Sequence, residues 1–599
     1  MRKLNKVLLS VLLAFGLVAC SSTTEETAAP AESGAGEKQT LTGTGKGIDG
    51  DVVVEVVADN ETIYSITVTE QNETPGLGAV ACEELPPVIV EKQSILVDGM
   101  AGATVTSDAI KEAVKAALES GNIDIAAFEV EVVEENVEKT DETLDYDVVI
   151  IGAGGAGLTA AAMATQEGAS VVVLEKMPLV GGNSLKASGG MNAAGTHFQE
   201  EAAADAETKE DVVAALKEST VENYIAETID GGHDINDVDL VTTMAEKSSE
   251  AIDWLEENGA PLPTIAATGG TVHYYLHEPE DGSAVGTFLV EKLNELDKSL
   301  GIEIMLNTEA TEILTDDSGA AVGVLANDAE HNYTINAKAV IVATGGFGAN
   351  FDMMSSYDPS LANAVTTNHA GATGDGINMA VAIGADTVDM EQIQLHPTVY
   401  QETGLLVSER LRSNGAILVN KDGVRFTNDL ATRDAVSQAE LKQPDAFAYI
   451  VYDSQFAEEK LYQKYVTSGI TVTGETLEEL AAAMAVPEEA FVETVTKWND
   501  ACENGNDEFG RNNGLVSLTE APFYAIKIAP GIHHTMGGLK INTETEVLDT
   551  DGNAIPGLFA CGETTGGVHG GNRIGGNAVC DFVVFGRIAG SNAAAYAAK

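Results

Sequence analysis

The alternation of hydrophobic and polar positions divides the chain into regions of different secondary structure. Within residues 43–125, the segments DVVVEVVAD and TIYSITVTE alternate as half-buried strands do, and a helical pattern follows at about 107–119. At 146–176, YDVVIIGAGGAGLTAAAMATQEGASVVVLEK places an apolar strand before glycines, a helix and a second apolar strand. Residues 455–505 have an acidic helical pattern, and strands resume at FYAIKIAPGIHHT. The pattern predicts an α/β protein of several domains.

The segment at 146–176 carries the glycine fingerprint of a dinucleotide-binding βαβ unit at its first turn. Gly152 permits the tight turn, Gly154 lets the backbone approach a pyrophosphate, and Gly157 lets helix and strand pack closely. The helix N-terminus then faces the phosphates. Glu175, eighteen residues after Gly157, can accept hydrogen bonds from an adenosine ribose, which favours a cofactor without a 2′-phosphate.

The first residues predict export. Arg2, Lys3 and Lys6 precede an apolar run at 7–18 that is too short to span a bilayer, as in a signal peptide. The run ends in LVAC and resembles a bacterial lipoprotein signal at 1–20, which implies lipidation of Cys20 and a lipid-anchored protein outside the cytoplasm. A plain signal peptide is the alternative. Residues 21–42 have the composition of a flexible stalk.

Length, charge and cysteine content argue against several classes of function. The length of 599 residues favours three or four structural units. A formal charge of −62 argues against nucleic-acid binding and against electrostatic adhesion to anionic lipid. Without any CxxC or CxxCH, neither a c-type haem nor a four-cysteine metal site is expected, and Cys82, Cys502, Cys561 and Cys580 are predicted to be mostly buried small hydrophobes.

Three further stretches identify a family resemblance: VGGNSLKASGGMNAAGT at 180–196, AVIVATGGFG at 339–348 and GLFACGETTGGVHGGNRIGGNAVCDFVVFGRIAG at 557–590. With the βαβ unit they resemble the FAD-binding domain of the fumarate reductase and succinate dehydrogenase flavoprotein superfamily. The resemblance implies non-covalent FAD and a Rossmann-type domain at 145–394 and 516–599, interrupted by a mobile α+β capping domain at 395–515. The cofactor-binding residues it implies are Gly152, Gly154, Gly155, Ala156, Gly157, Glu175, Lys176, Gly182, Asn183, Ser184, Gly189, Gly190, Gly345, Asp375, His534, Glu563, Asn577 and Ala578.

The scarce basic residues cluster in motifs: IQLHPT, SERLRSNGA, ATRD, GIHHTMGG and HGGNRIGGN. They resemble those of soluble, periplasmic-type fumarate reductases. The resemblance implies that Arg433 protonates the substrate, that Glu409 and Arg412 resupply the proton, and that the substrate is bound by His396, His533, Arg573, Ser408 and Gln394. From the residues alone, Arg433 is expected only to stabilise developing negative charge, because a free arginine has a pKa above about 12.

The favoured reaction is the reduction of an α,β-unsaturated carboxylate, with fumarate to succinate first among the candidates. Glu278 in YYLHEP stands where relatives acting on fumarate tend to carry a basic residue, so urocanate, acrylate, methacrylate or an aryl acrylate stays open as substrate. Two other classes also stay open: a flavin dehydrogenase or oxidase, and a lipoprotein that carries flavins for electron transfer without catalysis.

NETPGLG and DGMAGATVTS at 98–107 resemble the FMN-binding domain of exported respiratory proteins, here at 43–125, with a linker at 126–144. The resemblance implies that a flavin transferase attaches FMN through a phosphoester to Thr106, with Thr104 as second choice. An exposed turn with small neighbours is expected, and Ser107 is a candidate helix N-cap. Without haem, this FMN would relay electrons from a membrane or surface donor to FAD.

Overall fold

The structure, a computed structural model, describes residues 37–48, 50–73, 78–100, 103–132, 138–205, 210–267, 271–362, 364–457 and 460–599. The expected signal peptide, Cys20 and most of the stalk lie outside these residues. Within the described ranges, no helix combines the length and the apolar character needed to cross a bilayer.

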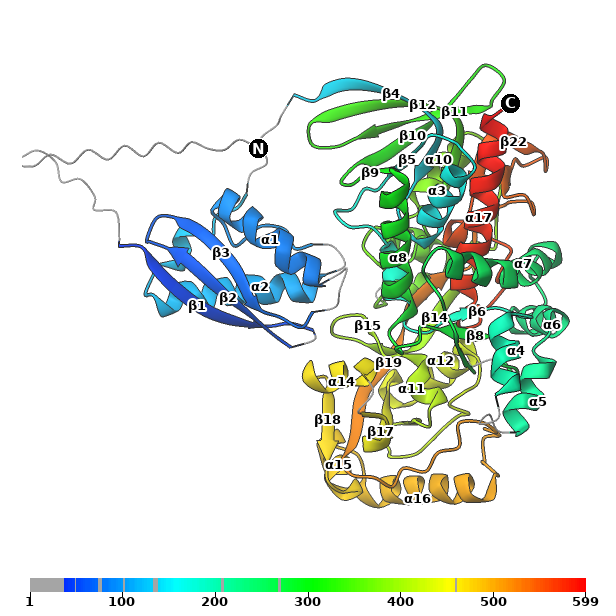
Figure 1. Cartoon of the computed structure of the whole chain (residues 1–599). Coiled ribbons are helices and arrows are strands. Elements are labelled where there is room, and N and C mark those ends of the chain that lie inside the picture. The colour runs from blue at the N-terminus through cyan, green and yellow to red at the C-terminus, as the bar shows by residue number, and fades with distance from the viewer. Residues whose placement is uncertain are drawn as a thin grey trace, which may run out of the picture.

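The N-terminal domain is a three-stranded antiparallel sheet covered by two helices (Figure 1). The alternation seen in the sequence buries Val52, Val54 and Val56 of one strand completely. Leu179, from beyond this domain, packs into the same core and joins it to the rest of the protein. The elements are β1 (Gln39–Lys46), β2 (Asp51–Ala58), β3 (Ile63–Glu70), α1 (Gly78–Lys92) and α2 (Thr104–Ser120).

The large domain is built on an eight-stranded sheet in the order β10-β11-β12-β4-β5-β9, with β22 and β21 joining beyond β12. Strands β12, β4, β5, β9 and β22 are parallel, as crossover βαβ units require. The strands are β4 (Thr140–Ile151), β5 (Val171–Leu174), β9 (Glu303–Met305), β10 (Glu309–Thr315), β11 (Ala321–Asn327), β12 (His331–Val342), β21 (Glu546–Leu548) and β22 (Ala554–Ala560).

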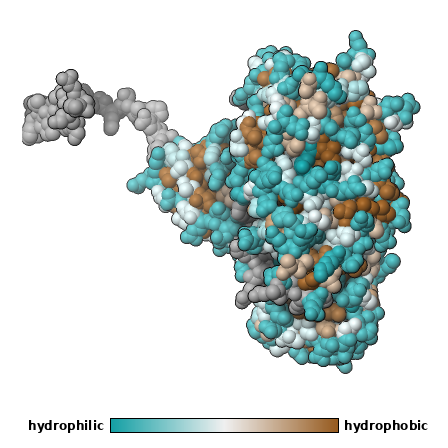
Figure 2. Space-filling view, turned by 45° about the vertical axis from the view of Figure 1, so that its right-hand side comes forward, coloured by the Kyte–Doolittle hydropathy of each residue, from teal (hydrophilic) through white to brown (hydrophobic). Residues whose placement is uncertain are grey.

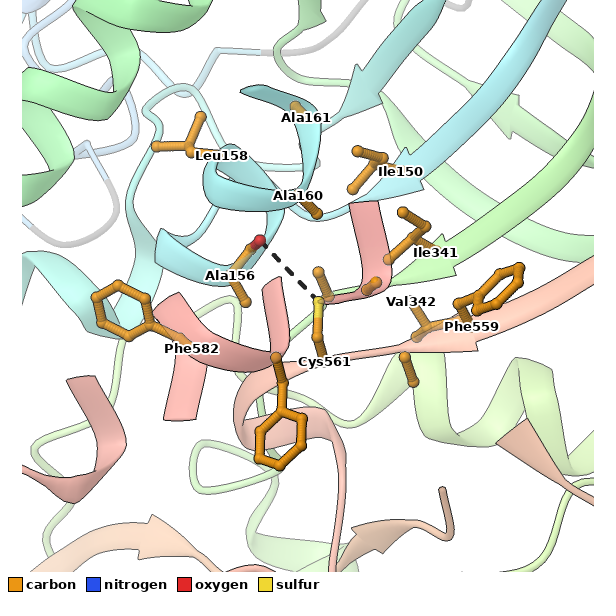
Figure 3. Packing of buried hydrophobic residues seen from close by; sticks show 14 of the residues in the cluster. Ile150, Ala156, Leu158, Ala160, Ala161, Ile341, Val342, Phe559, Cys561 and Phe582 are labelled. Carbon is orange, nitrogen blue, oxygen red and sulfur yellow. Dashed lines mark hydrogen bonds between the residues drawn. The ribbon is translucent and has the colours of Figure 1, made fainter. Parts of the chain in front are cut away.

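Helices α3 (Gly155–Gln166) and α17 (Asn577–Ala597) pack together, although more than 400 residues separate their starts. Figure 3 shows the apolar core beneath them, where Cys561 lies among Ile150, Ile341 and Phe559, with its Sγ 4.0 Å from the Ala156 carbonyl. The other helices of this domain are α4 (His197–Ala204), α5 (Glu210–Glu218), α6 (Val221–Gly231), α7 (Val238–Glu257), α8 (Val285–Leu300), α9 (Phe351–Tyr357) and α10 (Asp375–Ala382).

Two small sheets complete the large domain. One joins β6 (Met191–Asn192), β8 (Leu276–Glu278) and β7 (Thr264–Ala266), and the other joins β13 (Thr387–Val388) and β20 (Gly538–Leu539). The four cysteines of the described ranges are free; Cys82, Cys561 and Cys580 are buried and Cys502 is half-buried. This confirms that they are mostly buried small side chains.

Among its described residues, the capping domain has a six-stranded sheet and six α-helices, drawn in yellow-green to orange in Figure 1. Its strands are β14 (Ile393–Tyr400), β15 (Leu405–Leu406), β16 (Ile417–Val419), β17 (Ala448–Asp453), β18 (Thr471–Gly474) and β19 (Phe523–Thr535). Its helices are α11 (Glu409–Ser413), α12 (Arg433–Leu441), α13 (Ser454–Ala457), α14 (Lys460–Thr467), α15 (Leu477–Met484) and α16 (Glu488–Asn504).

Strand pairing moves two of the expected boundaries. β19 pairs with β14, β17 and β18, so the capping sheet reaches residue 535, beyond the end expected at 515. β4 begins at Thr140, inside the expected linker, because its first residues pair with the start of β12 at His331. Both differences arise from pairing between segments far apart in the chain.

Figure 2 shows hydrophilic residues over most of the visible face, with the N-terminal domain forming a smaller lobe beside the larger body. Such a surface agrees with the formal charge of −62.

Candidate active site

All three domains meet at one cavity of about 960 Å³. The N-terminal domain contributes Ala103, Thr104, Val105 and Thr106, and the capping domain contributes the start of α11. The large domain supplies most of the remaining wall. The volume lies at the upper end of the range for small-molecule and cofactor sites, which is about 300–1,000 Å³.

One wall of the cavity is made of backbone. Gly152 has a φ of 105°, and a Cβ there would lie 2.5 Å from the Ala343 carbonyl oxygen. A Cβ on Gly157 would lie 1.9 Å from the Gly152 carbonyl oxygen, whereas one on Gly154 would meet only Gly181, at 3.8 Å. Gly154 therefore has open space before it, at the N-terminus of α3, where a pyrophosphate could approach.

Glu175 lies at the end of β5 beside this turn. Its carboxylate accepts hydrogen bonds from the backbone N–H groups of Ala153 and Met177, both at 2.9 Å. Burial raises its pKa. Close by, the Lys176 amine pairs with Asp375 and donates to Thr373 at 2.6 Å. Glu175, Lys176 and Asp375 all line the cavity, whereas Thr373 does not.

Elsewhere the cavity presents buried polar atoms that have no hydrogen-bond partner among the described residues. His534 is 4% exposed, and neither ring nitrogen has a hydrogen-bond partner in the described part of the chain. The N-terminus of α17 opens onto the same space through Gly576 and Ala578, and its dipole favours a partial negative charge there. The open cradle at Gly154 and the orphaned ring of His534 both fit FAD.

The backbone wall also includes the loop from Gly182 to Gly190. Asn183 donates to Asn368 at 2.6 Å and to Glu563 at 3.0 Å, and Ser184 accepts from the Gly155 N–H at 3.0 Å. The expected cofactor-binding residues that line the cavity are Gly152, Gly154, Gly155, Ala156, Glu175, Lys176, Gly182, Asn183, Ser184, Gly189, Gly190, Gly345, Asp375, His534, Glu563 and Ala578.

A second wall is made of charged and polar side chains from the capping domain and from the loop before α17. Arg433, the first residue of α12, donates to the Glu409 carboxylate through its Nη2 at 2.6 Å and its Nε at 3.1 Å. Arg412 donates to the other oxygen of Glu409 at 2.8 Å. Burial alone would raise the pKa of Glu409, but Arg433 and Arg412 lower it to about 2. Glu409 is therefore ionised and held between two guanidinium groups.

Two histidines lie next to this ion-pair chain. The rings of His396 and His533 are 5.0 Å apart. His396 Nδ1 accepts from the Thr398 N–H at 3.2 Å, and its Nε2 has no partner among the described residues. Irregular pairing between β14 and β19 occurs at both histidines, as expected where a bulge redirects a side chain toward a site. Burial lowers the pKa of both, so they are neutral donors.

Arg573 completes the charged wall. It is 5% exposed and donates to the Ile574 carbonyl at 3.2 Å. Burial and the nearby charge of Arg433 lower its pKa. A bound carboxylate would relieve this repulsion between like charges. Arg433, Arg573, His396 and His533 all line the cavity, so the structure brings together residues that span 178 positions of the chain.

Four of the expected site residues lie behind the cavity rather than on it: Gln394, Arg412, Gly157 and Asn577. The Gln394 amide joins Arg433 to the Asn572 side chain and the Arg573 carbonyl. The side chain of Asn577 is used by Asn192, Tyr224 and Thr228. Both are supporting residues in this arrangement.

Comparison with known proteins agrees with this geometry. The family described as FAD binding domain matches residues 147–579, and the one described as FMN-binding domain matches residues 47–119. The NADH:fumarate oxidoreductase of Klebsiella pneumoniae is 42% identical over 91% of this chain and 57% of its own length. The chain belongs to the fumarate reductase family of flavoproteins.

Other members of this flavoprotein family differ in substrate. The urocanate reductase of Eggerthella lenta is 35% identical over 96% of this chain and 95% of its own length. The structure of an open conformation of a flavocytochrome c3 fumarate reductase matches with a TM-score of 0.64 at 40% identity, covering 76% of this chain and 79% of that chain. The Klebsiella relative is much longer, since the chain spans little more than half of it.

Two features of this flavoprotein's cavity were not expected from the sequence. Lys186, within the quoted stretch NSLKASGG, lines the cavity and donates to the carbonyls of Thr367 and Asn368 at 3.0 and 3.1 Å. Burial lowers its pKa to about 8. Arg410 approaches Glu278 to 3.6 Å, and both line the cavity. The position of Lys186 in a glycine-rich loop could have indicated from the sequence that it lines the cavity, whereas the pairing of Arg410 with Glu278 could not have been predicted.

The FMN-binding domain departs from expectation at its threonines. α2 begins at Thr104 rather than near 107, so Ser107 is no N-cap and its hydroxyl accepts from the Met100 N–H at 2.9 Å. Thr104 is exposed, but Thr106 is 2% exposed and its hydroxyl donates to Glu73. The expectation of an exposed hydroxyl is thus wrong for Thr106 in this arrangement, although both threonines border the cavity.

Proposed function

We propose that this protein is an exported, lipid-anchored reductase of α,β-unsaturated carboxylates, with fumarate to succinate as its main reaction. The observation that supports this proposal is the set of residues that line the cavity. Arg433, Arg573, His396 and His533 line the same cavity as the glycine-built backbone that fits FAD.

The cationic wall suits a substrate with two carboxylates. Arg573 can bind one carboxylate together with His533, and His396 can donate from its partnerless Nε2 to the other, where the Ser408 hydroxyl also borders the cavity. Cations fixed where negative charge develops lower the barrier to reduction. Pinning a planar olefin at both ends also supplies orientation.

The ion-pair chain supplies the proton. When bound, FAD supplies the hydride for one olefinic carbon. Arg433 is placed to give a proton to the neighbouring carbon, and Glu409, bonded to its Nη2 and Nε, is placed to return one. Arg412, on the far side of Glu409, continues the chain. Loss of the Arg433 proton leaves a neutral guanidine, and a proton passed along Arg412 and Glu409 restores its charge.

Electron entry is proposed through the N-terminal domain. Thr106 is the favoured attachment site for covalent FMN, with Thr104 second, and both border the cavity that fits FAD. A flavin transferase would attach the group, and a membrane or surface donor would deliver electrons. Cys20 is the proposed lipidation site. A covalent tether has a physical reason in an exported protein, where a freely dissociating FMN would be lost.

Glu278 no longer argues against a dicarboxylate. Its carboxylate lies 3.6 Å from the Arg410 guanidinium, so the local charge that would repel a second carboxylate is offset. Urocanate, acrylate, methacrylate and aryl acrylates are the alternatives that the experiment must separate.

The test is turnover of the FAD-loaded protein with a reduced viologen dye and a panel of these enoates. We expect fumarate to give the highest kcat/KM, because it alone in the panel places a carboxylate at both ends of the olefin. A higher kcat/KM with urocanate or an acrylate would reassign the substrate. No dye oxidation with any enoate would overturn the proposal in favour of a flavin carrier.

A further inference from the structure

The proton-donating pair Glu409 and Arg433 belongs to the capping domain, whereas the glycine wall belongs to the large domain. Reduction needs hydride from one domain and a proton from the other, delivered to adjacent carbons. A misplacement of about 1 Å can cost about 100-fold in rate. Contacts that join the two domains next to this pair therefore bear directly on the reaction.

One such contact lies beside Glu409. The next residue on α11, Arg410, extends to Glu278 at the end of β8, with 3.6 Å between Nη1 and Oε1. The Glu278 side chain is 5% exposed and that of Arg410 is 28% exposed, so solvent screens this ion pair less than a surface pair. The Ser408 hydroxyl, which caps α11, is also 3.2 Å from that of Ser188 in the large domain.

A second contact lies beside Arg433. The next residue on α12, Asp434, is 2.9 Å from His233 Nε2 in the turn after α6. That turn is bonded to the loop of Arg573: the Gly571 N–H donates to the Gly232 carbonyl at 2.8 Å, and the Asn572 amide donates to the Gly231 carbonyl at 3.1 Å. The substrate-binding loop and the proton donor are thus joined through one turn.

We infer that Glu278 and His233 are positioning residues that hold Glu409 and Arg433 in place over the cavity through Arg410 and Asp434. The inference rests on the proposed function, since it assigns these contacts to alignment of the proton relay. Each relay residue is followed in sequence by the residue that ties its helix to the large domain. Removing either tie leaves the relay residues intact but lets their helix shift relative to the bound substrate.

The experiment uses the FAD-loaded full chain and the charge-removing variant Glu278→Gln. Glu280→Gln is the matched control, because it makes the same change two residues away at an exposed position. A second variant reverses the pair, Glu278→Arg with Arg410→Glu, and His233→Gln probes the other contact. Reduced protein is mixed either with fumarate, which needs a proton from the relay, or with ferricyanide, which needs none.

We expect Glu278→Gln to slow reoxidation by fumarate about tenfold through kcat, with KM changed less, and to leave reoxidation by ferricyanide unchanged. The reversed pair should recover to within about threefold of the original rate, since the attraction is restored. His233→Gln should have a smaller effect, because its pair is more exposed. Equal slowing with ferricyanide, or a reversed pair no faster than the single variant, would overturn the inference.

Backbone hydrogen exchange gives a readout independent of activity. Residues 409–413 and 433–441 should exchange faster in Glu278→Gln than in the original protein or in Glu280→Gln. Unchanged exchange there would overturn the inference even if the rates fell. Failure of the original protein to react with any enoate would overturn the proposed function instead, and the exchange result would still decide whether the two pairs fix these helices.

Discussion

The two walls of the cavity are built on different principles. The glycine wall uses backbone from a continuous βαβ unit, in which Gly152, Gly154 and Gly157 lie within six residues. The charged wall uses side chains from β14, α11, α12, β19 and the loop before α17, which span residues 396–573. The first needs only local chain geometry, whereas the second exists only when distant segments meet. Substitutions in the glycine wall should therefore act by changing its shape, and substitutions in the charged wall should act by removing charge.

The largest expected effect comes from the charged wall. Arg433→Ala should lower turnover with an enoate by about 10²–10⁴-fold, because the proton donor and the partner of Glu409 are both lost. Steady-state assays with reduced dye measure the loss. Bound FAD, measured by absorbance, should be unchanged because Arg433 is not on the glycine wall. Full enoate turnover in this variant would rule out Arg433 as the proton donor.

The next effect separates shape from ligand contact in the glycine wall. Gly157→Ala should lower the free energy of unfolding of the apoprotein by about 1–3 kcal/mol or more, since its Cβ would lie 1.9 Å from the Gly152 carbonyl oxygen. Gly154→Ala should leave that free energy nearly unchanged but weaken FAD binding by more than about tenfold. Urea denaturation and FAD titration test this pair. Equal losses of apoprotein stability would show that Gly154 is also a packing residue.

A smaller effect is the pH dependence that buried histidines impose on stability. Burial lowers the pKa of His534 well below its usual value. Below about pH 6.5 the unfolded chain takes up a proton that the folded chain does not, so stability falls as the pH falls. His534→Gln should flatten the slope for the apoprotein by up to about 1.4 kcal/mol per pH unit.

Denaturation midpoints between pH 7 and pH 5 measure that slope. Asn332→Gln, at an exposed position of β12, is the control because it changes no titratable group. The assignment of this pH dependence to His534 is wrong if both variants change the slope equally.

The smallest expected effect concerns the whole molecule. A dianionic substrate approaching a chain of formal charge −62 is repelled at long range, so kcat/KM should rise modestly with ionic strength where encounter limits the rate. Stopped-flow or initial-rate measurements in increasing salt test it. A flat or falling response would indicate that the local Arg and His cluster outweighs the net charge.

The two walls of the cavity could be predicted from the sequence to different degrees. Periodicity and glycine spacing are local properties, and they located the βαβ unit with its glycines and Glu175. The family resemblance supplied the other expected cofactor residues, and the cavity contains all of the expected set but Gly157 and Asn577. In the charged wall it named the residues that gather there but put Gln394 on the cavity, although its amide is used between Arg433 and Arg573. The direction of the Gln394 amide depends on residues that are neighbours in space but distant in the sequence.

The FMN-binding domain shows the same limit. The motif located the turn and both threonines, but which hydroxyl is buried depends on Glu73, more than thirty residues earlier in the chain. The Glu278–Arg410 pair is even harder to predict from the sequence, since its members lie 132 positions apart on two domains.

By itself, the sequence determined the βαβ unit, the negative net charge and the inventory of chemical groups, because these follow from composition and short-range periodicity. Only the tertiary structure decided which groups share the cavity, which charges are paired and which polar atoms are left for a ligand. The physical reason is that burial and ion pairing depend on distances in space, and strand pairing between remote segments sets those distances.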